Sequence, residues 1–394
     1  MSSRAGPLAG VRVLDLTRLL PGGYASLLLA DMGADVVKVE EPGRGDYVRA
    51  VPPLAGEHSA AHLALNRGKR SVTLNLKKEA ARDIFVRLAG RFDVVLESFR
   101  PGVLDRLGCG YQELSRRHPR LVYAAITGYG QDGPRAQEAG HDIDYIAYGG
   151  VLAMTGAEHG PPVVPGVQIG DLAGGGMAAV IAVLAALRSR DATGKGAFCD
   201  VSMLDGVLSW IGVHAAMQQV LGGEPRRGLM PLTGAYPCYR VYPAADGYVA
   251  VGALEPHFWA ALCRALGRED LLGDAFATGE RRQEVIAELE AIFSSRARAD
   301  WAAAFDGVDA CVAPVCSIEE ALADPQLRAR GMIVEHGAGP TRALLLPGNP
   351  IRVGGSAPRR CSPAPALGEH TAEVLEEIGL GRRDLVALSD EGAL

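Results

Sequence analysis

His141 is the first residue of the sequence whose type and setting suggest proton chemistry. It follows Gly140 in the segment Gly140-His141-Asp142-Ile143-Asp144-Tyr145, and an apolar-periodic stretch comes next. This order predicts that His141 lies near the N-terminus of a helix, where free backbone N–H groups and the helix dipole favour negative charge. An enolate or thioester oxygen could be held there while the imidazole carries a proton. The alternative is that His141 only caps the helix.

Asp171 and Glu255 are acids at predicted ends of elements. Asp171 follows an apolar run and precedes Gly174-Gly175-Gly176 and a helix, so the glycines could let a ligand approach the backbone. Asp171 could instead be an ordinary N-cap. Glu255 follows the run 249–254, which begins in a strand predicted at 248–251, and an acid at a strand end can orient a histidine or tune its charge. The competing interpretation of Glu255 is a solvated or helix-capping carboxylate.

Two basic segments could bind an anion. The segment 66–70 holds three cations in Asn66-Arg67-Gly68-Lys69-Arg70, and Arg100 stands in the loop Ser98-Phe99-Arg100-Pro101-Gly102. Loops at strand ends of a doubly wound sheet are where anionic ligands bind, so these segments suit a phosphate-rich small molecule. Lys69 and Arg70 could equally form a solvated positive face.

Alternating strands and helices must position these residues. The pattern predicts strands at 11–16, 35–40, 71–76, 93–97 and 121–127, and a first helix at 24–32 that follows a break at 20–23. This alternation predicts an α/β fold with a mostly parallel sheet and helices on both faces. Glu40 ends the second strand, where a ribose-binding acid would stand, but the motif G-x-G-x-x-G is absent, which argues against a nicotinamide or flavin site.

The second half of the chain shows a change of pattern. Helices are expected at 177–189 and 200–222. Gly- and Pro-containing stretches divide the chain into five predicted ranges. They are a first part of a large domain at 1–222, a linker at 223–234, a small α+β domain at 235–330, a return linker at 331–361, and a C-terminal part of the large domain at 362–394.

The composition of the 394 residues bounds the function. Hydrophobic residues make up 48% and the net charge is −6, so neither a disordered chain nor a dedicated duplex-DNA binder is expected. The longest apolar run is too short for a bilayer and the start has no apolar signal core, so we expect a cytoplasmic protein without a membrane partner. Seven scattered cysteines form no zinc pattern, and no metal site is expected.

These residues lie in stretches that resemble the family III CoA-transferases (the CaiB/BaiF type), and within them most closely the α-methylacyl-CoA racemase branch. The matching stretches extend over almost the whole chain, which makes the resemblance specific. They are 10–16, 30–40, 66–77, 140–145, 170–171, 193–196, 246–247, 253–256, 324–326 and 367–371.

The resemblance implies an architecture and a set of site residues. It implies a Rossmann-like large domain made from both chain ends, a small inserted domain, and two chains that interlock as a homodimer with an acyl-CoA substrate. His141 and Asp171 match the two proton carriers of the racemases, and Glu255 matches the acid that pairs with the histidine. The residues that match CoA and thioester contacts are Leu74, Asn75, Leu76, Lys77, Arg100, Gly140, Asp142, Ile143, Asp144 and Tyr145.

The expected activity is racemisation of 2-methylacyl-CoA thioesters by proton transfer through an enolate, with no metal or redox cofactor. The alternative within the family is a CoA-transferase, in which Asp171 is the nucleophile that forms a mixed anhydride. A third interpretation is an acyl-CoA-binding protein without catalysis. Two departures bear on this choice, because the racemases usually have arginine where this chain has Glu41 and asparagine where it has Asp144.

Overall fold

The computed structural model describes residues 6–56, 58–222, 226–336, 343–354 and 362–394. The chain forms two compact units. The first contains both chain ends and lies within Met1–Gly149, Gly166–Trp210 and Pro325–Leu394. The second lies within Gly150–Pro165 and Ile211–Asp324.

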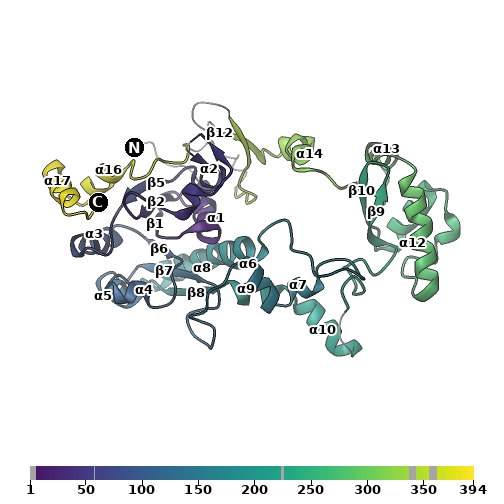
Figure 1. The fold of residues 1–394 in the computed structure, drawn as a ribbon, viewed down its shortest axis with the longest axis horizontal. Coiled ribbons are helices and arrows are strands. Elements are labelled where there is room, and N and C mark those ends of the chain that lie inside the picture. The colour runs from purple at the N-terminus through teal and green to yellow at the C-terminus, as the bar shows by residue number, and fades with distance from the viewer. Residues whose placement is uncertain (1–5, 57, 223–225, 337–342, 355–361) are drawn as a thin grey trace. The chain divides into compact units, whose positions relative to one another are not determined.

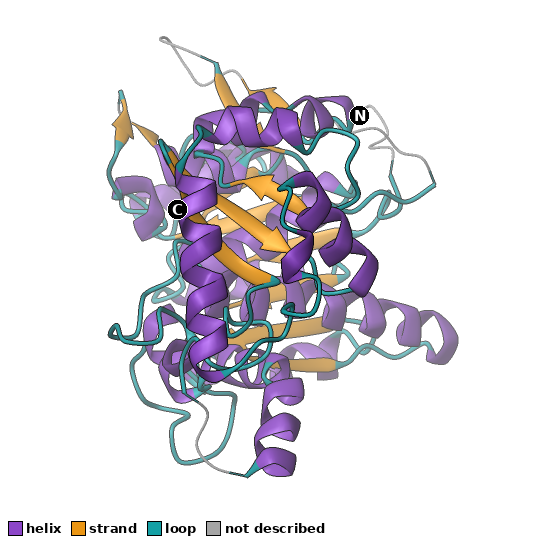
Figure 2. Ribbon diagram, turned by 90° about the vertical axis from the view of Figure 1, so that its right-hand side faces the viewer, coloured by secondary structure: helices purple, strands orange, loops and turns teal. Residues whose placement is uncertain are grey.

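A six-stranded parallel sheet forms the centre of the first unit (Figures 1 and 2). From one edge to the other its strands are β5 (Arg70–Thr73), β2 (Asp35–Glu40), β1 (Arg12–Asp15), β6 (Val94–Glu97), β7 (Val122–Thr127) and β8 (Phe198–Ser202). The sheet therefore grows outward in both directions from β1 and β6. In sheets of this kind ligands bind at the carboxyl ends of the strands, where the strand order reverses. Here that position lies between β1 and β6.

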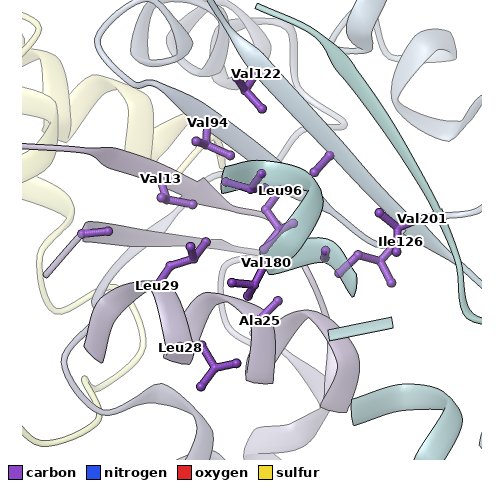
Figure 3. Packing of buried hydrophobic residues seen from close by; sticks show 14 of the residues in the cluster. Val13, Ala25, Leu28, Leu29, Val94, Leu96, Val122, Ile126, Val180 and Val201 are labelled. Carbon is purple, nitrogen blue, oxygen red and sulfur yellow. The ribbon is translucent and has the colours of Figure 1, made fainter. Parts of the chain in front are cut away.

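Helices cover both faces of this sheet because successive strand residues point to opposite sides. On one face Val13 and Val94 pack with α1 (Leu19–Asp31) and α8 (Ala178–Thr193), as Figure 3 shows. On the other face Leu14 and its neighbours pack against three helices, namely α3 (Glu79–Ala89), α5 (Tyr111–Arg117) and α16 (Thr371–Glu376). The predicted α/β class is confirmed, and the inner strands β6 and β7 are nearly continuous apolar runs, as expected for a sheet that is buried on both faces.

The second unit is a small antiparallel sheet with helices. Its strands are ordered β11 (Val312–Pro314), β10 (Gly247–Gly252) and β9 (Tyr239–Ala244). Its core centres on Trp259, Phe293 and Trp301, which lie on α11 (Pro256–Ala265), α12 (Gly279–Ser294) and α13 (Arg298–Ala304). Both indole N–H groups donate to backbone carbonyls, which satisfies their polar atoms inside the core.

Shorter elements complete both units. They are η1 (Tyr47–Ala50), β3 (Leu54–Ala55), β4 (His58–Ser59), α2 (Ala60–Asn66), α4 (Val103–Arg106), α6 (Asp142–Tyr148), α7 (Val151–Met154), η2 (Gly170–Met177), α9 (Met203–Trp210), α10 (Gly212–Leu221), η3 (Glu269–Leu271), α14 (Ile318–Ala323), α15 (Pro325–Ala329), β12 (Ile333–His336), β13 (Leu344–Pro347) and α17 (Arg382–Asp390).

Two expected elements differ from the structure. The first helix begins at Leu19 rather than at 24, because Pro21 lies in the first turn, where its missing N–H is not needed. The single helix expected at 200–222 is wrong, because the chain there forms the end of β8 and then α9 and α10. Strand β8 is short and borders on an apolar helical pattern, and tertiary pairing with β7 decides its conformation.

The bounds of the units also differ from the ranges expected from the sequence. Residues 150–165 and 211–222, which the sequence placed in the large domain, belong to the second unit. The expected return linker contains the antiparallel pair β12–β13. Residues 223–225 of the first linker and residues 337–342 and 355–361 of the second lie outside the described part of the chain.

Residues 170–193 form one apolar helical stretch whose first part is η2 and whose second part is α8. Its 24 residues and mean hydropathy of 1.8 would suffice for a membrane span, and half of its apolar window is buried inside the fold. Val180 and Val183 of this stretch pack into the core against β1, β6 and β7. A helix in the core of a protein can have the same length and apolar composition as a membrane span, so this stretch is weak evidence for a span.

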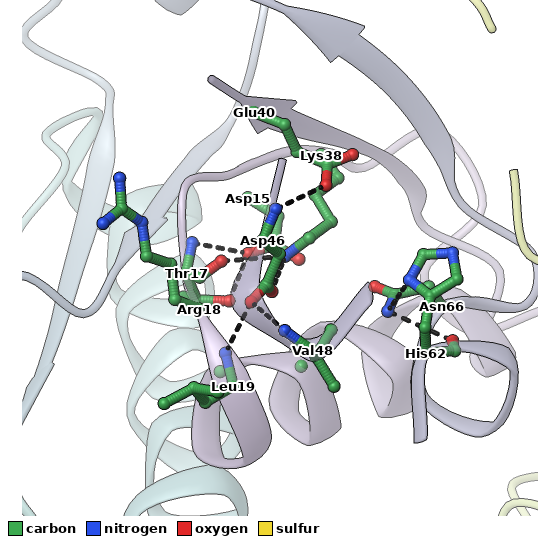
Figure 4. A network of polar contacts seen from close by, with 12 residues as sticks. Asp15, Thr17, Arg18, Leu19, Lys38, Glu40, Asp46, Val48, His62 and Asn66 are labelled. Carbon is green, nitrogen blue, oxygen red and sulfur yellow. Dashed lines mark hydrogen bonds and ion pairs between the residues drawn. The ribbon is translucent and has the colours of Figure 1, made fainter. Parts of the chain in front are cut away.

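A buried network of charges ties the ends of β1 and β2 to the loops that follow them (Figure 4). The Lys38 ammonium is 2.9 Å from Asp46 Oδ2 and donates to the backbone carbonyl of Thr17 at 2.8 Å. The Lys69 ammonium is 3.3 Å from Asp15 Oδ2 and donates to Ser26 Oγ at 2.7 Å. Each buried charge therefore has an opposite charge and hydrogen bonds, as burial requires.

Burial and neighbouring charges move the pKa values in this network in different directions. Burial lowers the pKa of Lys69 to about 8 against the attraction of Asp15. Against the cost of burial, Lys38 and Lys69 lower the pKa of Asp15. Burial alone would raise the pKa of Glu40, but two hydrogen bonds from Arg49, both 2.7 Å long, stabilise its carboxylate and help to lower the pKa to about 2. Because the carboxylate of Glu40 is engaged by Arg49 and Ser71, it is not free to bind a ribose.

The substitution Lys69→Met tests this network. It would leave the Asp15 carboxylate with one cation fewer at a fully buried site, so we expect the free energy of unfolding to fall by about 3–5 kcal/mol. Urea unfolding at pH 7 measures the change, and Lys195→Met, at an exposed position, is the matched control. A loss below about 1 kcal/mol in the Lys69 variant would show that the network contributes little to stability.

Candidate active site

Two adjoining cavities open at the carboxyl edge of the parallel sheet. The His141 cavity has a volume of about 530 Å³ and is lined by Gly140, His141, Tyr145 and Asp171, among others. The Lys77 cavity, of about 440 Å³, is lined by residues that follow β2 and β5, Lys77 included. Both volumes lie in the range of small-molecule sites.

His141 is brought to its cavity by the start of α6. It is the N-cap of this helix, as the sequence predicted, and its side chain is exposed. Its backbone N–H donates to Asp144 Oδ2 at 2.9 Å, and Tyr145 fixes Gly140 by donating its hydroxyl to the Gly140 carbonyl at 2.6 Å. The first N–H groups of the helix have no acceptor inside it. The start of α6 therefore places the imidazole on the wall of the cavity.

Asp171 is the second residue of η2, a π-helical segment that continues into α8. The N-cap interpretation of Asp171 is wrong, because Ile169 before it already has helical backbone angles. A π-helical turn is rare and shifts the direction in which side chains project, and such turns occur often at functional sites. The half-buried carboxylate of Asp171 lines the same cavity as His141.

Asp142 connects the two proton-carrier candidates. Its buried carboxylate accepts the backbone N–H of Asp171 at 3.0 Å, so the start of α6 and η2 are joined directly. Burial, and then the negative charge of Asp142, raise the pKa of Asp171 to about 6, while His141 opposes this rise. Asp171 therefore exchanges protons near neutral pH, as a general acid or base requires.

The glycines after Asp171 serve packing between helices. A Cβ on Gly174 would lie 2.9 Å from the carbonyl of Met203, and one on Gly176 would lie 2.9 Å from the carbonyl of Pro21. The expectation that they admit a ligand is wrong, because protein atoms of α1 and α9 fill that space. Close helix packing nevertheless fixes η2, and with it the position of Asp171.

The other predicted binding residues are divided among three places. Leu74, Asn75, Leu76 and Lys77 all line the Lys77 cavity, and Arg100 lines the His141 cavity. Ile143 is 43% exposed and lies outside the lining of both. Glu255 is the exposed N-cap of α11 in the second unit, so its pairing with His141 stays a prediction.

Three residues that the sequence argument missed line both cavities. They are Arg18, Tyr47 and Phe99. Arg18 and Phe99 lie in the segments that follow the strands β1 and β6, between which the strand order reverses. A search for charged residues after each predicted strand would have found Arg18, since ligands bind at that edge. Among the described residues, no group of three or more His, Cys, Asp or Glu could hold a metal ion.

Comparison with known proteins assigns the chain to a family. The model of CoA-transferase family III matches residues 8–371. The chain belongs to CoA-transferase family III. A family member, the human α-methylacyl-CoA racemase, is 36% identical over 390 residues, which cover 98% of this chain and 96% of that protein. Another, the human succinyl-CoA:glutarate CoA-transferase, is 34% identical over 378 residues, which cover 94% of this chain and 86% of that protein.

The fold agrees with this family. A crystal structure of a CaiB/BaiF family protein from Brucella suis superimposes with a TM-score of 0.82 and 33% identity, and covers 95% of this chain and 99% of that one. Family III contains enzymes that transfer CoA and enzymes that racemise acyl-CoA thioesters. Identities of 34–36% to both kinds establish the family and leave the reaction to be argued from the site.

The substitution Asp142→Asn tests the electrostatic coupling in the site. It keeps an oxygen that can accept the Asp171 N–H but removes the negative charge, so we expect the pKa of Asp171 to fall from about 6 toward its ordinary value. Carboxyl ¹³C NMR of aspartate-labelled protein measures this pKa, with the Asp171 signal assigned by its loss in Asp171→Asn. Asp144→Asn, on the same helical turn, is the control and should leave the pKa unchanged. Equal pKa values in all three proteins would contradict the coupling.

Proposed function

We propose that the protein is an α-methylacyl-CoA racemase that interconverts (R)- and (S)-2-methylacyl-CoA thioesters. The observation that carries the proposal is that His141 and Asp171 line one cavity and that the pKa of Asp171 is raised to about 6. Racemisation needs two groups that exchange protons near neutral pH at the same carbon. An imidazole has an ordinary pKa in that range, and burial brings the carboxyl group into it.

The reaction is a proton transfer at the carbon next to the thioester carbonyl. One of the two groups takes the α-proton as the C–H bond breaks, and the electron pair moves onto the thioester oxygen to form an enolate. Backbone N–H groups at the start of α6 near Asp142 hold the negative oxygen. The other group then donates a proton to the opposite face of the carbon, and the carbonyl forms again. The product therefore differs from the substrate only in the configuration of the α-carbon.

The proposal extends to the second unit and to a second chain. Glu255 would stabilise the protonated imidazole of His141, as the racemase motif implies. We propose an interlocked homodimer in which the small domain of one chain completes the site on the large domain of the other. Light scattering should therefore give twice the chain mass of 41.3 kDa. A mass of one chain at micromolar concentration would contradict the dimer.

A CoA-transferase is the second candidate, and the similarity to the glutarate transferase favours it. In that reaction Asp171 attacks the acyl carbonyl as a nucleophile, CoA leaves as a thiolate, and a mixed anhydride forms. The thiolate then attacks the Asp171 carbonyl of the anhydride, which releases the first carboxylate and leaves a thioester on Asp171. The acceptor acid displaces CoA from this thioester to form a second anhydride, and CoA attacks the acceptor's acyl carbonyl, which gives the new acyl-CoA and frees Asp171. The α-hydrogen stays in place throughout, which separates the two reactions experimentally.

Hydrogen exchange in deuterated water decides between them. We expect the wild-type protein to replace the α-hydrogen of a 2-methylacyl-CoA with deuterium when no acceptor acid is present, as followed by NMR. His141→Gln and Asp171→Asn should each lower racemisation by about 10²–10⁴-fold, because each removes one proton carrier. No exchange of the α-hydrogen, together with CoA transfer to an added acceptor acid, or trapping of an acyl-enzyme by hydroxylamine with His141→Gln almost fully active, would instead establish the transferase.

A further inference from the structure

We propose that Arg18, with Arg44 beside it, binds the diphosphate of the CoA thioester at the junction of the His141 and Lys77 cavities. This inference deepens the proposed function and rests on it for one point only, that the ligand is a CoA thioester. It gives a role to a guanidinium group that the family motifs did not identify.

Arg18 lies where the two cavities meet. It lines both of them, and so do Tyr47 and Phe99. The Arg18 guanidinium is 5.2 Å from the centre of the Tyr47 ring and 5.0 Å from the centre of the Phe99 ring. The two rings come from the loop after β2 and the loop after β6, so Arg18 is held at the reversal point of the sheet. A long, thin ligand that occupies both cavities must pass this residue.

Among the described residues, no carboxylate forms a direct ion pair with either guanidinium at this junction. Within the same part of the chain, the Arg18 guanidinium donates a hydrogen bond only to Tyr47 Oη, at 3.3 Å. The Arg44 guanidinium lies over the same Tyr47 ring, 4.6 Å from its centre. Glu41, in the lining of the Lys77 cavity, is paired with Lys77 at 2.9 Å and also interacts electrostatically with Arg18 and Arg44. Three cations therefore share the single carboxylate of Glu41, and the excess of two positive charges matches the two negative charges of a diphosphate.

The backbone around Arg18 is held in an unusual conformation. The Arg18 N–H donates to Ser98 Oγ at 3.0 Å, and the next residue, Leu19, has a left-handed φ of 60°. Asp46 fixes that turn by accepting the Leu19 N–H at 3.1 Å, and Asp46 is itself paired with buried Lys38. Figure 4 shows the contact between Leu19 and Asp46 and the guanidinium of Arg18 directed away from the network. A strained residue that buried charges hold in place is typical of functional sites.

The length of a CoA thioester favours the diphosphate as the group that Arg18 binds. The Lys77 cavity, lined by strand-end residues and loops, suits the adenosine end, while the acid–base pair must meet the thioester in the His141 cavity. The diphosphate lies between adenosine and the pantetheine arm, so it falls near the junction. A carboxylate on the acyl chain is the other anion that could meet a guanidinium, and the experiment separates these two sources.

Binding measured by calorimetry tests the proposal without any turnover. The ligands are CoA, dephospho-CoA and pantetheine, and the variants are Arg18→Gln, Arg18→Lys and Arg44→Gln. We expect Arg18→Gln to weaken binding of CoA and of dephospho-CoA equally, by about 10- to 100-fold, and to leave pantetheine binding unchanged. Arg18→Lys should recover part of the loss, because it restores the charge without the planar fork. Arg44→Gln should show a smaller loss with the same dependence on the diphosphate.

Arg116→Gln, on the exposed surface of α5, is the matched control and should bind every ligand as the wild type does. Unchanged CoA affinity in Arg18→Gln, or an equal loss for pantetheine, would overturn the assignment. A loss confined to succinyl-pantetheine, with acetyl-pantetheine and CoA unaffected, would show that Arg18 binds an acyl carboxylate and would also overturn it. If the wild-type protein binds no CoA, the proposed function fails with the inference, whereas CoA binding that ignores Arg18 removes the inference alone.

Discussion

The pairing of buried charges between the ends of β1 and β2 is the constraint on which the rest of the site depends. Lys38 and Lys69 carry ammonium groups into the fold, and each needs a carboxylate partner, because an unpaired buried charge is strongly destabilising. The partners, Asp46 and Asp15, lie on or next to the loops that line the cavities. The cost of burying these charges is thus offset by contacts that also fix the walls of the cavities. The same contacts therefore determine both the stability of the fold and the geometry of the site.

Carboxyl groups near the sheet edge fall into two classes according to their partners. Asp15 and Glu40 have cations close by and their pKa values are lowered. Asp171 and Glu97 are desolvated by the fold, and no lysine or arginine in the described part of the chain pairs with either of them. Their pKa values rise to about 6 and about 8. A raised pKa alone does not identify a catalytic group, because Glu97 is the more perturbed of the two and is buried outside the lining of both cavities. Asp171 combines the raised pKa with access to a cavity.

The sequence predicts the parallel α/β sheet and the helix start at His141 because both depend on short-range patterns. Apolar runs of strand length between amphipathic helices define β1, β2, β6 and β7. Two of the failures involve tertiary contacts: β8 depends on its pairing with β7, and the glycines of η2 depend on the carbonyls of α1 and α9. The pattern of apolar residues does not predict the π-helical turn that positions Asp171. Arg18 was overlooked because an arginine after a strand resembles any surface cation until the strand order is known.

The same scaffold suits racemases and transferases because both reactions begin from one polarised thioester carbonyl. Amide groups that stabilise an enolate oxygen also stabilise the oxyanion formed when a carboxylate attacks that carbonyl. Asp171 is ionised above a pH of about 6, so near pH 7 it is mostly a carboxylate that can act as base or as nucleophile. The second proton carrier is what makes the difference, because only racemisation needs a group on the other face of the carbon. His141, exposed on the wall of the same cavity, supplies such a group, and it is the residue on which the choice of reaction depends.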